Sequence, residues 1–130
     1  TMQIHQSAED YLETILMLTQ RMGKVRSIDV VNELGFTKAS VSIAMKKLRE
    51  NGYIAVDGEG NLTLLEPGRE IAERIYSRHR LLTHFFIQLG VDEKTAAEDA
   101  CKAEHILSEQ TLEKIRESAL RNDAAHPQAK

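Results

Sequence analysis

The chain has 130 residues, of which 42% are hydrophobic and 28% carry a charge, the balance of an ordinary soluble globular protein. No apolar run approaches the roughly 18 residues of a membrane-spanning helix, which argues against an integral membrane protein. A single cysteine excludes an intramolecular disulfide and favours a reducing cytoplasm. The length suffices for one domain or two small ones with a helical core.

The net charge of −3 conceals two regions of opposite sign. Residues 24–51 carry six basic side chains against three acidic ones, whereas residues 92–117 carry eight acidic side chains against four basic ones. The first region would attract phosphate groups and the second would attract cations. This asymmetry keeps nucleic acid among the expected partners despite the negative total.

The segment from Ser7 to Arg21 predicts an amphipathic helix, because Ser7 is a suitable N-cap and apolar residues recur at helical spacing. Asp10 and Glu13 lie three residues apart beside the apolar face. They are candidate metal ligands, since carboxylates bind divalent cations. The alternative interpretation is an acidic first turn that favours the helix dipole.

Residues 27–52 predict a helix-turn-helix, with a tight turn at Gly35. Ser27 is expected to cap the first helix and Thr37 the second. The second helix exposes small or polar side chains near its start and basic ones further on, as a helix that enters the DNA major groove does. The alternative is an ordinary lysine-bearing surface helix. The candidate DNA-binding residues are Ser27, Thr37, Lys38, Ala39, Ser40, Ser42, Lys46 and Lys47.

Residues 53–65 contain two strand-like segments around a glycine-containing turn and predict a β-hairpin. A hairpin directly after a recognition helix is the wing of a winged helix-turn-helix. Asp57 and Glu59 stand at its tip, where negative charge is unfavourable for contact with phosphate. We therefore expect the wing to contribute little affinity for DNA.

Pro67 in a first helical turn predicts a long helix from Pro67 to Leu89. His79 falls on the core side of this helix, between Ile75 and Leu82, and is a candidate metal ligand. A hydrogen-bonded core histidine is the alternative interpretation. The arginines of this helix, at positions 69, 74, 78 and 80, are expected to lie mostly outside.

The stretch Cys-Lys-Ala-Glu-His at 101–105 belongs to an acidic helical part that we expect to run from Asp92 to about Arg121. On a continuous helix Cys101, Glu104 and His105 fall on one narrow stripe. That stripe would offer a thiol, a carboxylate and an imidazole to one divalent metal ion. The alternative is a small buried cysteine beside a solvated Glu-His pair.

A break in this acidic part is expected near Ser108, whose hydroxyl can cap the helix that follows. In that last helix Leu112, Ile115 and Ala119 are spaced for packing against another helix. We expect the packing partner to be a second subunit.

The motifs, taken in order, resemble the diphtheria-toxin-repressor family of metal-dependent transcriptional regulators. The resemblance covers almost the whole chain. It rests on Ser-Ala-Glu-Asp-Tyr-Leu-Glu at 7–13, the winged helix-turn-helix, Arg-His-Arg-Leu-Leu at 78–82 and Glu-Asp-Ala-Cys-Lys-Ala-Glu-His at 98–105. It implies a homodimer that binds a palindromic operator in double-stranded DNA when metal is bound.

The resemblance also implies two neighbouring metal sites, one of which is the main activating site. The equivalent of Glu104 can bridge the two metals in the manganese-responsive branch. Iron-type members typically have Met at position 10, and manganese-type members often have Glu at position 101, so this sequence is mixed. The main site would use Asp10, Cys101, Glu104 and His105, and the neighbouring site Glu13 and His79.

We expect Mn(II) as the cofactor and Fe(II) as the next candidate, while Zn(II), Co(II) or Cd(II) could substitute at the thiolate. The chain ends without the third domain of iron-type members, which predicts the short architecture of manganese-transport regulators. No His-Glu-x-x-His pattern, nucleophile elbow or phosphate loop occurs, so we do not expect an enzyme. The alternative function is a metal-independent winged-helix regulator that responds to a small molecule.

The predicted fold class is mainly α. Residues 1–70 are expected to form a winged helix-turn-helix DNA-binding domain. Residues 71–130 are expected to form a helical metal-binding and dimerisation domain. No membrane partner is expected.

Overall fold

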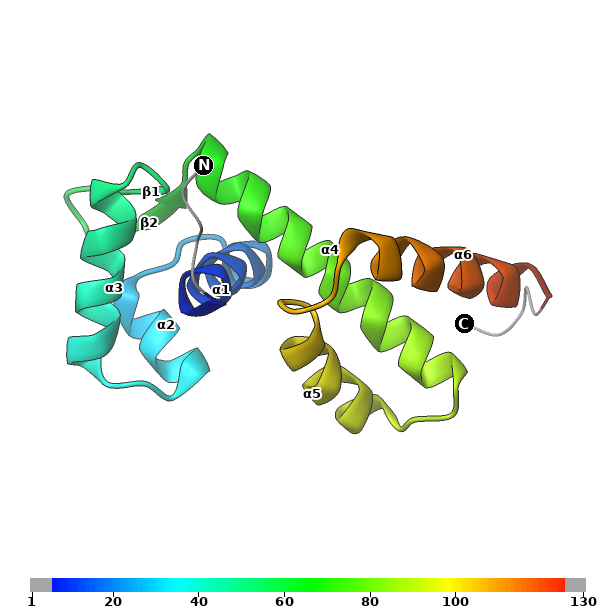
Figure 1. Cartoon of the computed structure of the whole chain (residues 1–130). Helices are drawn as coiled ribbons and strands as arrows, with labels where there is room; N and C mark the ends of the chain where they lie inside the picture. The colour runs from blue at the N-terminus through cyan, green and yellow to red at the C-terminus, as the bar shows by residue number, and fades with distance from the viewer. Residues whose placement is uncertain (1–5, 126–130) are drawn as a thin grey trace. The chain divides into compact units, whose positions relative to one another are not determined.

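The computed structural model describes residues 6–125, which contain six helices and a two-stranded sheet (Figure 1). In chain order these are α1 (Gln6–Met22), α2 (Ser27–Leu34), α3 (Lys38–Glu50), β1 (Ile54–Val56), β2 (Leu62–Leu64), α4 (Glu66–Gln88), α5 (Glu93–Ala103) and α6 (Glu109–Ala125). They divide into two compact units, the first ending at Arg74 and the second beginning at Ile75, so α4 contributes to both. A winged helix-turn-helix followed by a helical unit confirms the predicted fold class.

The turn between α2 and α3 has the geometry that the sequence predicts. Gly35 adopts a left-handed φ of 71°, and its N–H donates to the carbonyl oxygen of Val31 at 2.8 Å. Thr37 then caps α3, because its hydroxyl accepts the N–H of Ser40 at 3.1 Å. The helix-turn-helix is therefore fixed by local chemistry at two adjacent helix ends.

The cap predicted for α2 was wrong by one residue. Arg26, not Ser27, is the N-cap residue, and Ser27 is the first residue of the helix. The N–H of Arg26 donates to the carboxylate of Asp29 at 2.9 Å. A reciprocal contact from the third helical residue thus replaces the serine cap.

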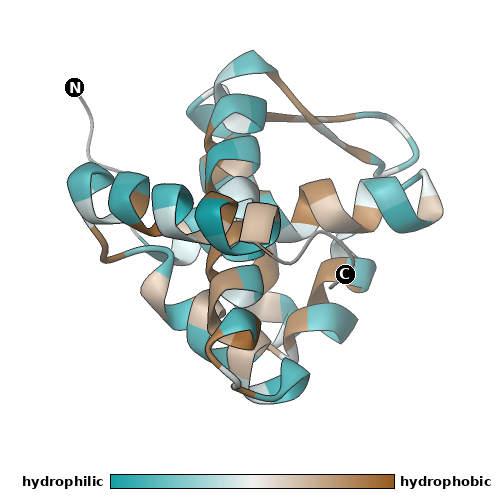
Figure 2. Ribbon diagram, turned by 90° about the vertical axis from the view of Figure 1, so that its right-hand side faces the viewer, coloured by the Kyte–Doolittle hydropathy of each residue, from teal (hydrophilic) through white to brown (hydrophobic). Residues whose placement is uncertain are grey.

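The first unit has an aliphatic core to which three helices and the hairpin contribute. Hydrophobic and hydrophilic residues occupy different sides of the same helices (Figure 2), as amphipathic patterning requires. Its buried aliphatic side chains include Leu12, Ile15, Leu16, Val25, Val30, Val41, Met45, Leu48, Ile54, Leu62 and Leu64.

The hairpin is an antiparallel pair in which Ile54 faces Leu64. Gly60 adopts a φ of 86° in the turn between the strands. The start of α4 approaches the hairpin so closely that a Cβ at Gly68 would overlap the carbonyl oxygen of Tyr53. This contact places the long helix directly after the wing.

The second unit is built from α5, α6 and the part of α4 that begins at Ile75. Leu82, Ala100 and Leu112 form a buried cluster that draws one residue from each helix. Asp92 caps α5 by accepting the N–H of Thr95 at 3.1 Å. Partly buried residues that pack against the cluster are Leu81, Phe86, Ala103, Leu107 and Ile115.

The last helix begins where the sequence predicts and packs where it does not. Ser108 caps α6 by accepting the N–H of Thr111 at 3.2 Å. Leu112 and Ala119 are buried within the chain itself, and the side-chain amide of Gln88 on α4 donates to the carbonyl oxygen of Ala119 at 3.2 Å. The expectation that these residues pack on a second subunit was wrong, because α4 already provides their partner. None of the helices described is long and apolar enough to cross a membrane.

Candidate metal centre and DNA-binding face

Glu104 is the central residue of the candidate metal centre in the second unit. Its side chain is completely buried, and it is the C-cap residue of α5. Its two carboxylate oxygens approach different imidazoles: Oε2 lies 3.3 Å from Nδ1 of His79, and Oε1 lies 3.5 Å from Nε2 of His105. The carboxylate therefore lies between a histidine of α4 and a histidine of the turn that follows α5.

His79, Cys101 and Glu104 form a group of potential metal ligands. One donor atom from each residue lies within 4.8 Å of the other two. Two donors that each sit about 2.1 Å from one ion, at tetrahedral or octahedral angles, are roughly 3.0–3.4 Å apart. The 3.3 Å between the imidazole and the carboxylate falls in that range. The geometry therefore fits two ligands of a shared ion.

Buried polar atoms without a hydrogen-bond partner among the described residues include both carboxylate oxygens of Glu104 and Nδ1 of His79. The Nδ1–Oε2 distance is short enough for an ion pair, but its geometry is not that of a hydrogen bond. An unsatisfied buried polar group costs about 1–3 kcal/mol, so such groups are rare in folded proteins. A divalent cation would satisfy these atoms, and the donor set therefore fits a metal.

The predicted stripe at 101–105 is only partly correct. Helix α5 ends at Ala103, and His105 lies in the turn beyond it. Cys101 is exposed, while the side chain of Glu104 is buried and that of His105 is only 2% exposed. Within the described residues of this unit, Cys101 groups with His79 rather than with His105. The stripe fails because it assumes a helix that continues through His105.

Asp10 and Glu13 lie on α1 in the first unit. The side chain of Glu13 is buried and Asp10 is half-buried. Their spacing of three residues gives both carboxylates similar directions around the helix. Their role as ligands stays a prediction.

The outward side of α3 carries most of the predicted DNA-binding residues. Ser27 is the exception, because it lies at the start of α2 and is half-buried. Thr37 is exposed but is also the cap of α3, and its hydroxyl donates to Oγ of Ser40 at 2.9 Å. The residues exposed on or just before α3 are Thr37, Lys38, Ala39, Ser40, Ser42, Lys46 and Lys47.

Sequence analysis missed Ile43, which is 58% exposed. Ile43 lies four residues after Ala39 and three before Lys46, so the three share the side of α3 opposite Val41 and Met45. Single exposed apolar residues are ordinary on protein surfaces, so what singles Ile43 out is its position among the predicted DNA-binding residues. The sequence signal that could have identified Ile43 is that this isoleucine lies outside the inward i, i+3, i+4 pattern of α3.

Arg78 was also missed, because its position on α4 predicted an outward side chain. The guanidinium is only 13% exposed. Its Nη1 donates to the carbonyl oxygen of Glu104 at 3.1 Å, and its Nη2 pairs with the carboxylate of Glu109. Arg78 therefore contacts the segment that carries the candidate ligands.

The wing tip is organised by a carboxylate. Asp57 accepts the N–H of Asn61 at 2.8 Å, the side-chain amide of Asn61 at 3.0 Å and the N–H of Glu59 at 2.9 Å. These hydrogen bonds, led by the one from the Asn61 backbone, lower the pKa of Asp57 below its ordinary value of 3.8. The tip thus carries a firmly ionised group, and the small contribution of the wing to DNA affinity stays a prediction.

Comparison with known families matches both units. Residues 3–62 match the profile described as "Iron dependent repressor, N-terminal DNA binding domain". Residues 65–127 match "Iron dependent repressor, metal binding and dimerisation domain". The two profiles account for the winged helix-turn-helix and the helical unit respectively.

Individual relatives agree with the profiles. An uncharacterised HTH-type transcriptional regulator of Methanocaldococcus jannaschii is 37% identical over 113 residues, which cover 85% of this chain and 90% of the relative. The HTH-type transcriptional regulator MntR of Bacillus subtilis is 34% identical over 109 residues, covering 84% of this chain and 77% of the relative.

Solved structures with the same fold include two manganese regulators. A manganese-dependent transcriptional repressor in complex with manganese has a TM-score of 0.79 and 28% identity over 86% of this chain. The manganese regulator SloR has a TM-score of 0.74 and 26% identity over 85% of this chain. The present chain spans about half, 52%, of the length of each of those two chains.

Proposed function

This chain belongs to the iron-dependent repressor family, and from that premise we propose that it represses transcription by binding palindromic operator DNA as a homodimer when Mn(II) or Fe(II) is bound. The residues up to about 70 would serve as the DNA-binding domain and the remainder as the metal-binding and dimerisation domain. The matches at residues 3–62 and 65–127 support this division. The cytoplasm, where DNA and reduced cysteine coexist in bacteria and archaea, is the proposed location.

One observation carries the metal-dependent part of the proposal. The carboxylate of Glu104 is completely buried, has no hydrogen bond on either oxygen, and faces the imidazoles of His79 and His105. A purely structural glutamate in that position would be expected to accept hydrogen bonds. The alternative function, a metal-independent regulator that senses a small molecule, offers no role for this arrangement.

We propose that His79, Cys101 and Glu104 hold one ion and that Glu104 and His105 contribute to a second. Bound metal supplies positive charge and open coordination positions to these donor atoms. The two oxygens of Glu104 lie toward different histidines, so one carboxylate can serve two ions. The family resemblance and the chemistry of carboxylates add Asp10 and Glu13 as further ligands.

Mn(II) is the metal that we propose first and Fe(II) second. Carboxylates at positions 10, 13 and 104 suit Mn(II), while the Cys101 thiolate also binds Fe(II), Zn(II), Co(II) or Cd(II). Affinity for most ligand sets rises from Mn(II) toward Zn(II), so selectivity has to come from coordination number and metal availability.

For DNA we propose that α3 enters the major groove. Lys46 and Lys47 would contact phosphates, which adds affinity without sequence preference. Ala39 and Ser42 would approach base edges, and Ile43 would contact thymine methyl groups, the apolar feature of that groove. Metal and DNA binding are linked, so each strengthens the other by the same free energy.

The test begins with anaerobic calorimetric titration of the metal-free protein with Mn(II) and then with Fe(II). Wild-type protein should bind either ion, and Glu104→Ala should lose binding while its circular dichroism is unchanged. Glu113→Ala is the matched control, because Glu113 is an exposed glutamate of α6 that pairs with Arg116. Unchanged affinity in Glu104→Ala would disprove the assigned site.

The DNA part is tested with a random-sequence duplex library selected on the protein with and without Mn(II). Enrichment of a palindromic sequence only in the presence of Mn(II) is the expected result. Equal enrichment without metal would favour a metal-independent regulator.

A further inference from the structure

Arg78 stands next to a candidate ligand in the chain and contacts a second one in space. It precedes His79 on α4, and its guanidinium is largely buried. One nitrogen donates to the backbone carbonyl of Glu104, and another pairs with Glu109 in the first turn of α6. Arg78 therefore holds both ends of the segment from Glu104 to Glu109, which joins α5 to α6.

In this segment two backbone N–H groups share one carbonyl acceptor. The N–H groups of Ile106 and Leu107 both donate to the carbonyl oxygen of Ala103, at 3.1 and 3.3 Å. The carbonyl of Glu104 follows the last turn of α5, where helical carbonyls have no intrahelical donor. Arg78 supplies the donor from another helix, and its positive charge suits a helix C-terminus.

We propose that Arg78 is a positioning residue for the metal centre: by holding the carbonyl of Glu104 and the carboxylate of Glu109, it fixes the turn from which the Glu104 and His105 side chains reach the ion. The inference rests on the proposed function, since it concerns the same ligands. Arg78 itself binds no metal, because a guanidinium has donors and no lone pair to give.

The charge of Arg78 and its positioning contacts predict opposite effects of its removal on the affinity for metal. A guanidinium near a bound cation repels it, so removing the charge alone would strengthen metal binding. Removing a group that orients ligands weakens it, typically by about 10–100-fold for the outer partners of metal ligands. The sign of the change in affinity therefore separates the positioning role from simple electrostatics.

The experiment compares Arg78→Met, Arg78→Lys and Arg80→Met in titrations of the metal-free full chain with Mn(II). We expect Arg78→Met to bind about 10–100-fold more weakly than wild type. The affinity of Arg78→Lys should lie between those of wild type and Arg78→Met, because lysine keeps the charge but cannot contact both the Glu104 carbonyl and the Glu109 carboxylate as the guanidinium does. Arg80→Met is the matched control on the same helix: Arg80 is exposed and lies over the Tyr76 ring, and its loss should leave affinity unchanged.

Circular dichroism and unfolding of the metal-free variants are measured alongside the titrations. Arg78→Lys is the variant to interpret if Arg78→Met fails to fold. Titration with Co(II) adds a second readout, because a thiolate-to-cobalt absorption band would change in intensity if Cys101 and Glu104 no longer converged on one ion. A folded Arg78 variant that binds Mn(II) as tightly as wild type, or more tightly, overturns the proposal.

Failure of this inference and failure of the proposed function are distinguishable. If wild-type protein binds no Mn(II) or Fe(II), the proposed function fails and takes the inference with it. If wild-type protein binds metal and Arg78→Lys and Arg78→Met bind equally well, only the role of Arg78 is overturned.

Discussion

The two units of this chain differ in what occupies their centres. Aliphatic side chains from α1, α2, α3 and the hairpin fill most of the first unit, whose buried residues also include Glu13 on α1. In the second unit Leu82, Ala100 and Leu112 form a smaller cluster, and the fully buried carboxylate of Glu104 directly follows α5, the helix that supplies Ala100. Burial of aliphatic surface stabilises a fold without any ligand, whereas a buried carboxylate with no hydrogen bond destabilises it. The first unit thus contains its own source of stability, and the second contains a cost that a cation would remove.

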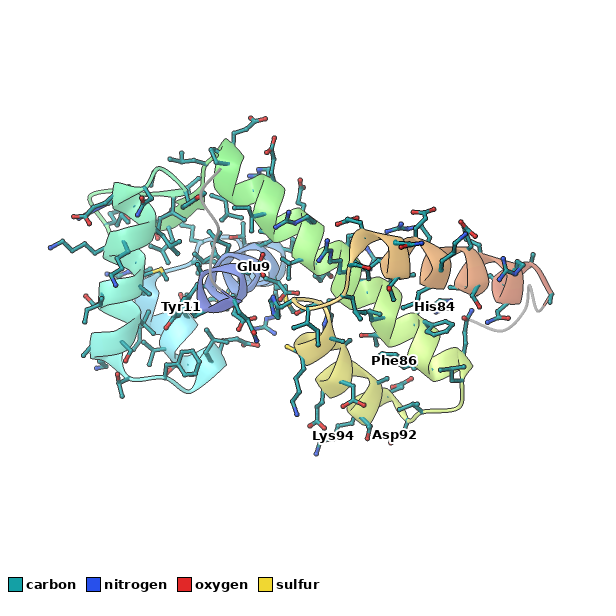
Figure 3. All side chains as sticks on the ribbon, viewed as in Figure 1. Glu9, Tyr11, His84, Phe86, Asp92 and Lys94 are labelled. Carbon is teal, nitrogen blue, oxygen red and sulfur yellow. The ribbon has the colours of Figure 1, made fainter. Side chains whose placement is uncertain are left out.

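Polar side chains at the far end of the second unit, around the His84 labelled in Figure 3, do find partners. His84 on α4 lies toward α6, and its Nε2 is 2.9 Å from the carboxylate of Asp123. The side-chain amide of Gln88 donates to the same carboxylate at 3.0 Å and accepts from the side chain of Asn122 at 3.1 Å. These groups satisfy one another, unlike the atoms around Glu104. A polar network by itself therefore does not point to a metal; the unsatisfied carboxylate oxygens of Glu104, facing two imidazoles, are what single out the candidate metal centre.

The largest effect is expected from a substitution in the aliphatic core of the first unit. Ile15→Ala should lower the free energy of unfolding by about 2–5 kcal/mol, because it removes a fully buried side chain and leaves a cavity. Urea unfolding followed by circular dichroism measures the loss. The same substitution at the exposed Ile43 is the control and should change stability by no more than about 0.5 kcal/mol. Equal losses at the two positions would contradict the assigned core.

A smaller effect of opposite sign is expected in the second unit. Glu104→Met replaces the unsatisfied carboxylate with an apolar side chain of similar length, so the metal-free protein should gain about 1–3 kcal/mol. Wild type should gain about 2.7 kcal/mol from Mn(II) at a hundred times its dissociation constant, and the variant should gain nothing. Urea unfolding with and without Mn(II) measures both changes. A metal-free variant less stable than wild type would show that Glu104 supports the fold directly.

The sequence predicted the fold well wherever a helix end is decided by neighbouring residues. Gly35, Thr37 and Ser108 each act within a few residues, through a left-handed φ or a cap hydrogen bond, and all three were identified. The end of α5 was missed because no glycine or proline follows Ala103. There the turn is satisfied by Arg78, 26 residues earlier in the chain, and a local pattern contains no trace of that contact.

The same distinction applies to the candidate site. Residue type identified His79, Cys101, Glu104 and His105 as possible ligands, and the structure brings them near one another in the second unit. Which donors share one ion depends on where α5 ends, at Ala103, and the assignment of ligands to the two predicted sites stays a prediction. Ile43 was overlooked because small, polar and basic residues are the ones expected on a DNA-facing helix surface, and an exposed isoleucine is not among them.

The smallest effects are expected from substitution of one carboxylate in each unit, Asp57 in the first and Asp92 in the second. Hydrogen bonds from the Asn61 backbone lower the pKa of Asp57 in the wing, and those from the Thr95 backbone lower the pKa of Asp92 at the start of α5. A folded-state pKa below the ordinary 3.8 means that the unfolded chain takes up the proton first as the pH falls. Each carboxylate therefore stabilises its unit fully above that value and loses its contribution as the pH drops below it.

Asp57→Asn and Asp92→Asn isolate these two contributions. Amide hydrogen exchange should be faster than in wild type at pH 6, at Glu59 and Asn61 in the first variant and at Thr95 in the second. The free energies of unfolding of wild type and variant should then converge only as the pH falls below 3.8 and through the lowered folded-state pKa of each aspartate, where the native carboxylates become neutral. Neither change should alter affinity for Mn(II), because neither residue is among the proposed ligands. Suppose that Asp92→Asn changed the affinity for Mn(II) and Asp57→Asn did not. The start of α5 would then be shown to affect the position of the turn that carries Glu104 at the other end of that helix.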